Sequence, residues 1–282
     1  MSISSSAMLV RLSITTWTAK KLDKVQTEKV LQDNNADYDA GRFEKNLMAG
    51  TNLLKKLNNE TTRLRHWSEK HTMPWEDRGS RLLPTSLFME FKQDWAKHVQ
   101  RLNSMVDDVI DNLDDLKLVA RSKLGSMYCE EDYPTADEIR AKYSFRLQFT
   151  PVPESGHFAL DLAAQELEDT KRSCDQLIAE RVAEAHKSSW DKLYNKLKDM
   201  SERLVDNPDK ISRWHDTFVD DPVELCKLLK HFNVNQDPQL ESARLALEDA
   251  MRGTDIDSIK DSPIVRANLK GKVDSILKTF DW

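Results

Sequence analysis

Hydrophobic residues recur every three or four positions over two long stretches of this chain. The first runs from Thr85 or Ser86 to Leu124, and the second from Leu160 to Leu204. This spacing places the apolar side chains on one stripe of an amphipathic helix and is close to a heptad seam. With a rise of about 1.5 Å per residue, the helices would be roughly 60 and 70 Å long. The pattern predicts that they fold back on each other as an antiparallel coiled-coil arm; pairing between two chains is the alternative.

Two shorter segments alternate between apolar and polar residues, which is the period of a half-buried strand. They are Met8–Trp17 and Tyr143–Thr150. The second lies between the two long helices, shortly after Thr135 and Glu138, which have the spacing of a capping box. Because a lone strand would leave its backbone groups without hydrogen bonds, we expect the two strands to pair with each other.

Shorter helices are expected on either side of the long pair. The N-terminal ones are predicted at Thr18–Leu31, Ala40–Met48 and Thr51–His71, with a loop at Trp75–Pro84. After Pro208, turns with Asp or Ser before proline separate the later segments, since such pairs commonly begin a helix. These segments are Lys210–Val219, Val223–Phe232, Gln239–Arg252 and Pro263–Phe280.

The pattern as a whole predicts a mainly α fold with a long antiparallel helical or coiled-coil arm. A small two-stranded β element and a short-helix C-terminal region complete the fold. We expect residues 1–206 to form a helical domain that contains the arm and the strands, and residues 207–282 to form a small helical region.

Composition agrees with a helical protein, because only 7 Gly and 9 Pro occur among 282 residues, of which 32% are charged. The net charge of −6 argues against a generic nucleic-acid binder. Three distant cysteines, Cys129, Cys174 and Cys226, fit neither a disulfide framework nor a zinc finger. The N-terminus lacks a signal-peptide pattern, and no apolar run approaches the roughly 20 residues of a membrane helix. We expect a cytoplasmic protein, in the host cytoplasm if it is phage-encoded, without a membrane partner.

No pattern in the sequence indicates catalysis. We therefore predict no catalytic, cofactor-binding or metal-binding residues. The sequence lacks a phosphate-binding glycine loop, and His66 and His71 are five positions apart, which separates them around a helix. Two weaker candidates are a single-strand nucleic-acid surface, where cations alternate with aromatic rings, and an acidic-aromatic tail for a partner. The surface consists of Lys55, Lys56, Arg63, Arg65, Lys70, Arg78 and Arg81; the tail is Phe280, Asp281 and Trp282.

Several segments resemble an uncharacterised phage and plasmid family, described as a domain of unknown function. These are the opening LVRLSITTWTAKKLD, DAGRFEKNL at Asp39–Leu47, LLP at Leu82–Pro84, the run from Leu124 to Phe145, and PVP at Pro151–Pro153. The resemblance covers roughly residues 8 to 170. Members of that family are often encoded beside a MoxR-type AAA+ ATPase and a von Willebrand-type protein. The resemblance implies a place in an ATPase-adaptor system and carries no catalytic residue.

The function predicted from these features is that of a non-enzymatic, phage-type assembly or adaptor protein. It would self-assemble as a homo-oligomer or dock on an AAA+ ATPase partner, because helices longer than one compact domain requires commonly pair with another chain. The alternative is a single-strand nucleic-acid-binding accessory factor that uses the basic surface.

Overall fold

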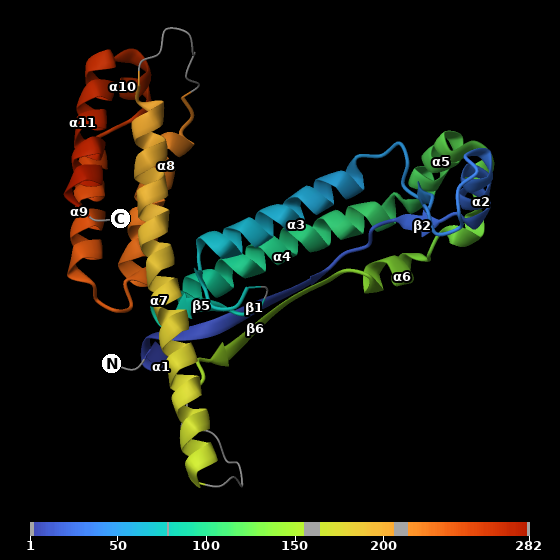
Figure 1. Ribbon diagram of the computed structural model, residues 1–282. Coiled ribbons are helices and arrows are strands. Elements are labelled where there is room, and N and C mark those ends of the chain that lie inside the picture. The colour runs from blue at the N-terminus through green and yellow to red at the C-terminus, as the bar shows by residue number, and fades with distance from the viewer. Residues whose placement is uncertain (1–2, 78, 155–163, 206–213, 281–282) are drawn as a thin grey trace. The chain divides into compact units, whose positions relative to one another are not determined.

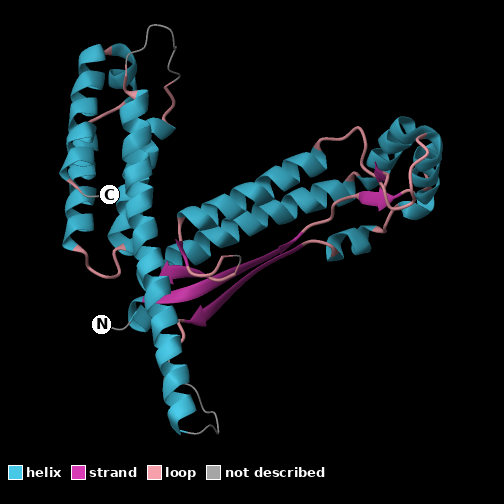
Figure 2. Ribbon diagram, in the orientation of Figure 1, coloured by secondary structure: helices cyan, strands magenta, loops and turns pink. Residues whose placement is uncertain are grey.

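The computed structural model describes residues 3–77, 79–154, 164–205 and 214–280, and helices dominate it (Figures 1 and 2). The helices are α1 Ile3–Ser6, α2 Lys24–Asp33, α3 Leu53–Lys70, α4 Phe88–Asp111, α5 Leu113–Leu124, α6 Ala136–Ala141, α7 Ala164–Arg203, α8 Thr217–Phe232, α9 Pro238–Met251, α10 Ile256–Asp261 and α11 Pro263–Thr279. The strands are β1 Ala7–Thr15, β2 Lys20–Leu22, β3 Glu44–Asn46, β4 Met73–Pro74, β5 Arg81–Pro84 and β6 Ser144–Pro151. Over these residues, none of the helices combines the length and the apolar character that a membrane crossing requires.

The chain forms two compact units, and each of them is assembled from separate stretches of sequence. The first unit contains Met1–Arg11, Ser68–Phe91 and Gln148–Trp282, and the second contains Leu12–Trp67 and Lys92–Leu147. The expected boundary between residues 206 and 207 lies outside the described residues. The C-terminal helices belong to the same unit as α7, on which α8 and α11 pack.

The main sheet has four strands in the order β4-β5-β1-β6. Strands β1 and β6 are neighbours, as the alternating pattern predicts. The sheet is larger than the expected two-stranded element, because it also contains β4 and β5. Strand β5 pairs antiparallel with both β1 and β4, and Leu82 lies opposite Leu9 on one side and Met73 on the other. The segment predicted as a loop therefore supplies a strand. Leu82 and Leu83 are both completely buried, so this short strand lacks the alternation that identifies β1 and β6.

Helices α7 to α11 all belong to the first unit, where α8 packs on α9 and α11 packs on α7 and α9. The predicted caps are present at two of these helices: Asp237 accepts from backbone amides at the start of α9, and Ser262 does so at the start of α11. The prediction is wrong at Pro222, which lies inside α8 and is buried. The cap expected before that proline is absent because α8 has already begun at Thr217.

In the second unit, α4 packs on α3, and the predicted pairing of α4 with the helix at 160–204 is wrong. Leu64, Trp95 and Leu102 form a buried cluster between these two helices. The polar contacts give an antiparallel order, since Arg101 pairs with Glu60 at 3.3 Å while the His98 ring lies against Trp67. The hydrophobic period identifies the face of α4 that must be buried. It does not identify the helix that buries it.

Two further helices of the second unit differ from the prediction. The expected helix at 85–124 is interrupted at Asn112, which separates α4 from α5 and whose side chain donates to the carbonyl of Asp108. The expected helix at Ala40–Met48 is instead strand β3, which pairs with β2 in a two-stranded sheet. The capping box of α6 is confirmed, with reciprocal bonds between Thr135 and Glu138.

Strand β3 carries a buried lysine that ties four parts of the second unit together. The Lys45 ammonium lies 2.6 Å from Asp132 and 3.6 Å from Asp23, and donates to the Met127 carbonyl at 2.8 Å. Burial alone would lower the pKa of Lys45, but the hydrogen bond and charge of Asp132, with the charge of Asp23, raise it above its ordinary value. Nearby, the Tyr133 hydroxyl donates to the Leu47 carbonyl at 2.7 Å.

We expect Lys45→Met to lower the free energy of unfolding by about 3 kcal/mol, because it leaves the carboxylate of Asp132 without its closest cation. Urea unfolding followed by circular dichroism measures the change. The matched control is Lys20→Met, which removes an exposed pair with Glu44 and should cost less than about 1 kcal/mol. Equal losses in the two variants would show that the Lys45 cluster has no special role.

Candidate interaction surface on helix α7

The later half of α7 is built into the first unit. Its buried stripe consists of Ala185, Ser189, Leu193, Leu197, Met200 and Leu204 at steps of three and four. Polar contacts to other elements accompany the stripe: Lys196 pairs with Asp221 of α8 at 3.4 Å, and Ser201 donates to Asp274 of α11 at 2.5 Å. In Figure 1, α8 and α11 lie beside this yellow-orange part of α7. This half of the helix therefore has partners for its whole apolar face.

The earlier half of α7 differs in its contacts. Over residues 166–184 of the described helix, the ion pairs recorded between side chains all run along α7 itself, such as Glu168–Lys171 at 3.7 Å and Arg181–Glu184 at 3.6 Å. The apolar positions continue in step with the buried stripe, but Leu167, Cys174, Ile178 and Val182 are only half-buried. Leu177, beside them, is 52% exposed.

One helix thus carries one continuous stripe, of which the later part is buried and the earlier part half-buried in the described residues. The helix is 40 residues long, and its main packing partners are β4, α8 and α11. Ion pairs at i and i+3 support an isolated helix by only a few tenths of a kcal/mol each. The half-buried stripe is the geometry that a second helix covers in a coiled coil.

A second lysine, on α7, contacts the end of α3. The Lys192 ammonium donates to the carbonyls of Glu69 at 3.4 Å, Lys70 at 3.4 Å and Thr72 at 2.9 Å, and lies 4.5 Å from the centre of the Phe232 ring. Carbonyl groups at a helix C-terminus lack intrahelical partners and carry partial negative charge, which favours a cation there. Burial, with the nearby charge of Arg81, lowers the pKa of Lys192 to about 7.

Arg81 of β5 reaches the same carbonyl groups. Its guanidinium donates to the Thr72 hydroxyl at 2.6 Å, the Thr72 carbonyl at 3.3 Å and the Glu69 carbonyl at 3.4 Å. Burial lowers the pKa of this guanidinium from its ordinary value. Arg81 and Lys192 therefore hold the end of α3 in the first unit. The contacts of Lys45 and Lys192 could not be predicted from the sequence, because an isolated lysine in a helix or strand pattern is typical of an exposed face.

The predicted basic surface is smaller in the structure than in the sequence. Lys55, Lys56, Arg63 and Arg65 are exposed on α3, although Arg63 pairs with Glu60 at 3.2 Å. Two of the remaining residues are engaged in other contacts, and the third is not described. Lys70 pairs with Asp221 at 3.3 Å and Glu224 at 2.7 Å, Arg81 holds the end of α3, and Arg78 lies outside the described residues.

The predicted partner tail is described only at its first residue. The Phe280 ring lies 6.2 Å from the Trp190 ring of α7, so this residue packs within the first unit. Asp281 and Trp282 lie outside the described residues.

No family model, no curated protein and no solved structure matches this chain. The resemblance to the phage and plasmid family stays a prediction, as does its implied AAA+ partner.

The depressed pKa of Lys192 predicts a specific dependence of stability on pH. An unfolded lysine titrates near pH 10.4, so between about pH 7 and pH 10 the unfolded chain binds a proton that the folded chain has released. The free energy of unfolding should therefore rise with pH in this window, by up to about 1.4 kcal/mol per pH unit from this group. We expect urea unfolding of Lys192→Met at several pH values to lack this increment.

The exposed Lys187 of the same helix supplies the control, since Lys187→Met should follow the unsubstituted protein at each pH. Parallel pH profiles for the Lys192→Met variant and the unsubstituted protein would contradict the assignment.

Proposed function

We propose that this chain is a non-enzymatic assembly or adaptor protein that associates with a second copy of itself through the earlier half of α7. The surface concerned is the half-buried stripe of Leu167, Cys174, Ile178 and Val182, with Leu177 beside it. Below it is called the α7 stripe.

The observation that carries the proposal is the change in contacts along a single helix. Up to Glu184 the recorded ion pairs are local to α7, and from Ala185 onward the same stripe is buried against other elements. Burial of one large aliphatic side chain contributes about 1.5–3 kcal/mol. Several such side chains in step along a helix supply a sufficient reason for two copies to pair.

The resemblance suggests a second use of the same surface, which is docking on an AAA+ ATPase. A helix of a partner protein would cover the α7 stripe in the same way as a second copy. Self-association is the more economical proposal, because a coiled-coil seam is complementary to its own copy.

The nucleic-acid alternative rests on the four exposed cations of α3. The helical period places Lys56 and Arg63 close to one line, with Lys55 and Arg65 at other angles around the helix. The four cations are therefore spread around the polar face of α3 and do not form a single line along it. A salt-sensitive shift of a labelled oligonucleotide, abolished by charge reversal at all four positions, would favour this alternative.

The α7 stripe is tested by light scattering coupled to size exclusion over a range of concentrations. The unsubstituted protein should have a mass at a multiple of 32.6 kDa. The double variant Ile178→Glu and Val182→Glu should weaken association by more than about a hundredfold, because it removes two apolar side chains from the seam.

A matched control shifts the same two charges by one position. Ala179 and Ala183 are exposed on α7 and lie away from the stripe, so Ala179→Glu with Ala183→Glu should assemble as the unsubstituted protein does. Circular dichroism verifies that both variants stay folded. A monomer at every concentration of the unsubstituted protein, or equal assembly of both variants, would contradict the proposal.

A further inference from the structure

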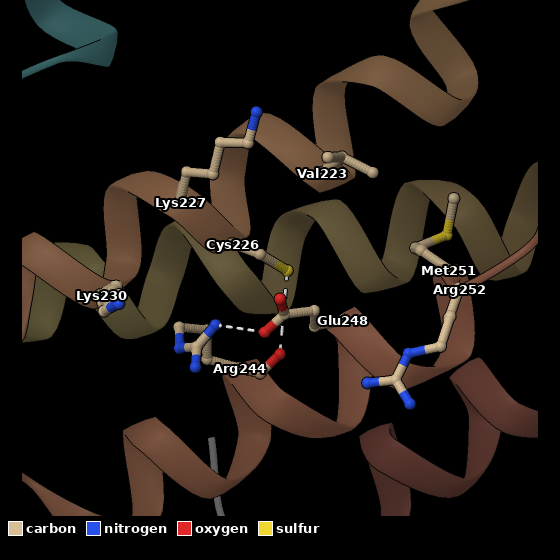
Figure 3. Close-up of a pocket in the computed structure, with 8 residues that line it drawn as sticks. All are labelled: Val223, Cys226, Lys227, Lys230, Arg244, Glu248, Met251 and Arg252. Atoms are coloured by element: carbon tan, nitrogen blue, oxygen red, sulfur yellow. Dashed lines mark hydrogen bonds and ion pairs between the residues drawn. The ribbon is translucent and has the colours of Figure 1, made fainter.

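Helices α8 and α9 form a hairpin with a groove along its outer surface (Figure 3). The groove encloses about 370 Å³, and both helices contribute lining residues. Val223, Cys226, Lys227 and Lys230 come from α8, and Arg244, Glu248, Met251 and Arg252 from α9 and its end. On each helix the positions recur at three- and four-residue steps, so the groove follows the seam between two facing stripes.

The floor of the groove is apolar and fixed. Cys226 and Met251 are buried, and the Cys226 thiol lies 3.7 Å from the carbonyl of Arg244, to which it donates. Burial raises the pKa of this thiol to about 11, so at neutral pH it is an uncharged apolar group. Val223 is 38% exposed at one end of the groove and extends the apolar surface to solvent.

One ion-pair network fixes the wall of the groove. The Arg244 guanidinium donates to Glu248 at 2.7 Å and to Glu241 at 2.7 and 2.9 Å, which uses both edges of its fork. These carboxylates raise the pKa of Arg244. The network neutralises Glu248, the single carboxylate among the residues that line the groove.

The rim of the groove is basic, although the chain as a whole has a net charge of −6. Lys227, Lys230 and Arg252 are exposed there, and Arg252 has a solvent-exposed partner, Asp249, at 3.3 Å. Lys227 and Lys230 are one helical turn apart, which leaves two ammonium groups on the same edge. A narrow apolar floor between cations is complementary to a segment that has apolar residues on one side and carboxylates on the other.

We propose that the α8–α9 groove binds an acidic amphipathic helix of a partner protein, with its apolar residues on Val223 and Met251 and its carboxylates against Lys227 and Lys230. A groove between two helices is a common binding site for a third helix, whose apolar residues recur with the same period. This surface is separate from the α7 stripe, so the inference does not depend on self-association.

Fluorescence anisotropy with designed peptides tests the proposal. The probe is a fluorescein-labelled peptide with leucines along one helical face and glutamates elsewhere. Two comparison peptides replace its glutamates with glutamine or its leucines with alanine. We expect saturable binding of the first peptide to the full chain, and at least about tenfold weaker binding of the other two.

Variants of the chain locate the binding surface. Lys227→Glu with Lys230→Glu should weaken binding at least about tenfold, and Val223→Asn should weaken it about threefold. The matched control reverses two exposed lysines on the outer face of α7, Lys187→Glu with Lys198→Glu, and should bind the peptide unchanged. The Ile178→Glu and Val182→Glu variant should also bind unchanged, which separates this test from that of self-association.

Three results would overturn the proposal: no saturable binding of the acidic leucine peptide, equal binding of the alanine peptide, or equal binding by the Lys227→Glu and Lys230→Glu variant. Equal binding of the alanine peptide would indicate general attraction of polyanions, including nucleic acids, rather than a seat for an amphipathic helix.

Discussion

Several elements of the first unit meet at the carbonyl groups that end helix α3. Lys192 of α7 and Arg81 of β5 both donate to them, and the Phe232 ring at the end of α8 lies against the Lys192 ammonium. A helix end inside a protein must satisfy these carbonyls, and here the amino group of Lys192 and the guanidinium of Arg81 do so instead of a glycine cap. One local requirement thus fixes a strand and two helices around a single residue, Thr72.

Charged pairs continue this arrangement at the start of α8. Lys70 and His71 contact Glu224, and Lys70 and Lys196 contact Asp221. These pairs are partly exposed, and each contributes little by itself. Lys196 specifies the position of α8 against α7, and Lys70 and His71 specify its position against the end of α3, because alternative alignments would separate opposite charges. The polar network therefore defines the geometry that the buried leucines of the same helices stabilise.

The sequence predicts those parts of the fold that depend on local chemistry. The caps at Asp237 and Ser262, the capping box at Thr135 and the alternation of β1 and β6 all require only neighbouring residues, and all are present. Strands β3 and β5 could not be predicted in this way, because strands of three and four residues depend on partners distant in sequence. The same limit explains the wrong partner for α4. The apolar stripe of α7 could be predicted from the hydrophobic period of the sequence. The point along it where intramolecular packing stops could not, because it depends on tertiary structure.

The continuity of α7 has a kinetic consequence. Starting a helix is unfavourable because several residues must be fixed before the first hydrogen bond repays the lost entropy, whereas each further residue adds one bond. The later half of α7, packed against α8 and α11, supplies that nucleus for the earlier half. The α7 stripe is therefore presented on a helix already formed before any partner arrives. Association with it should lose less conformational entropy than folding upon binding, so that encounter rather than ordering would limit its rate.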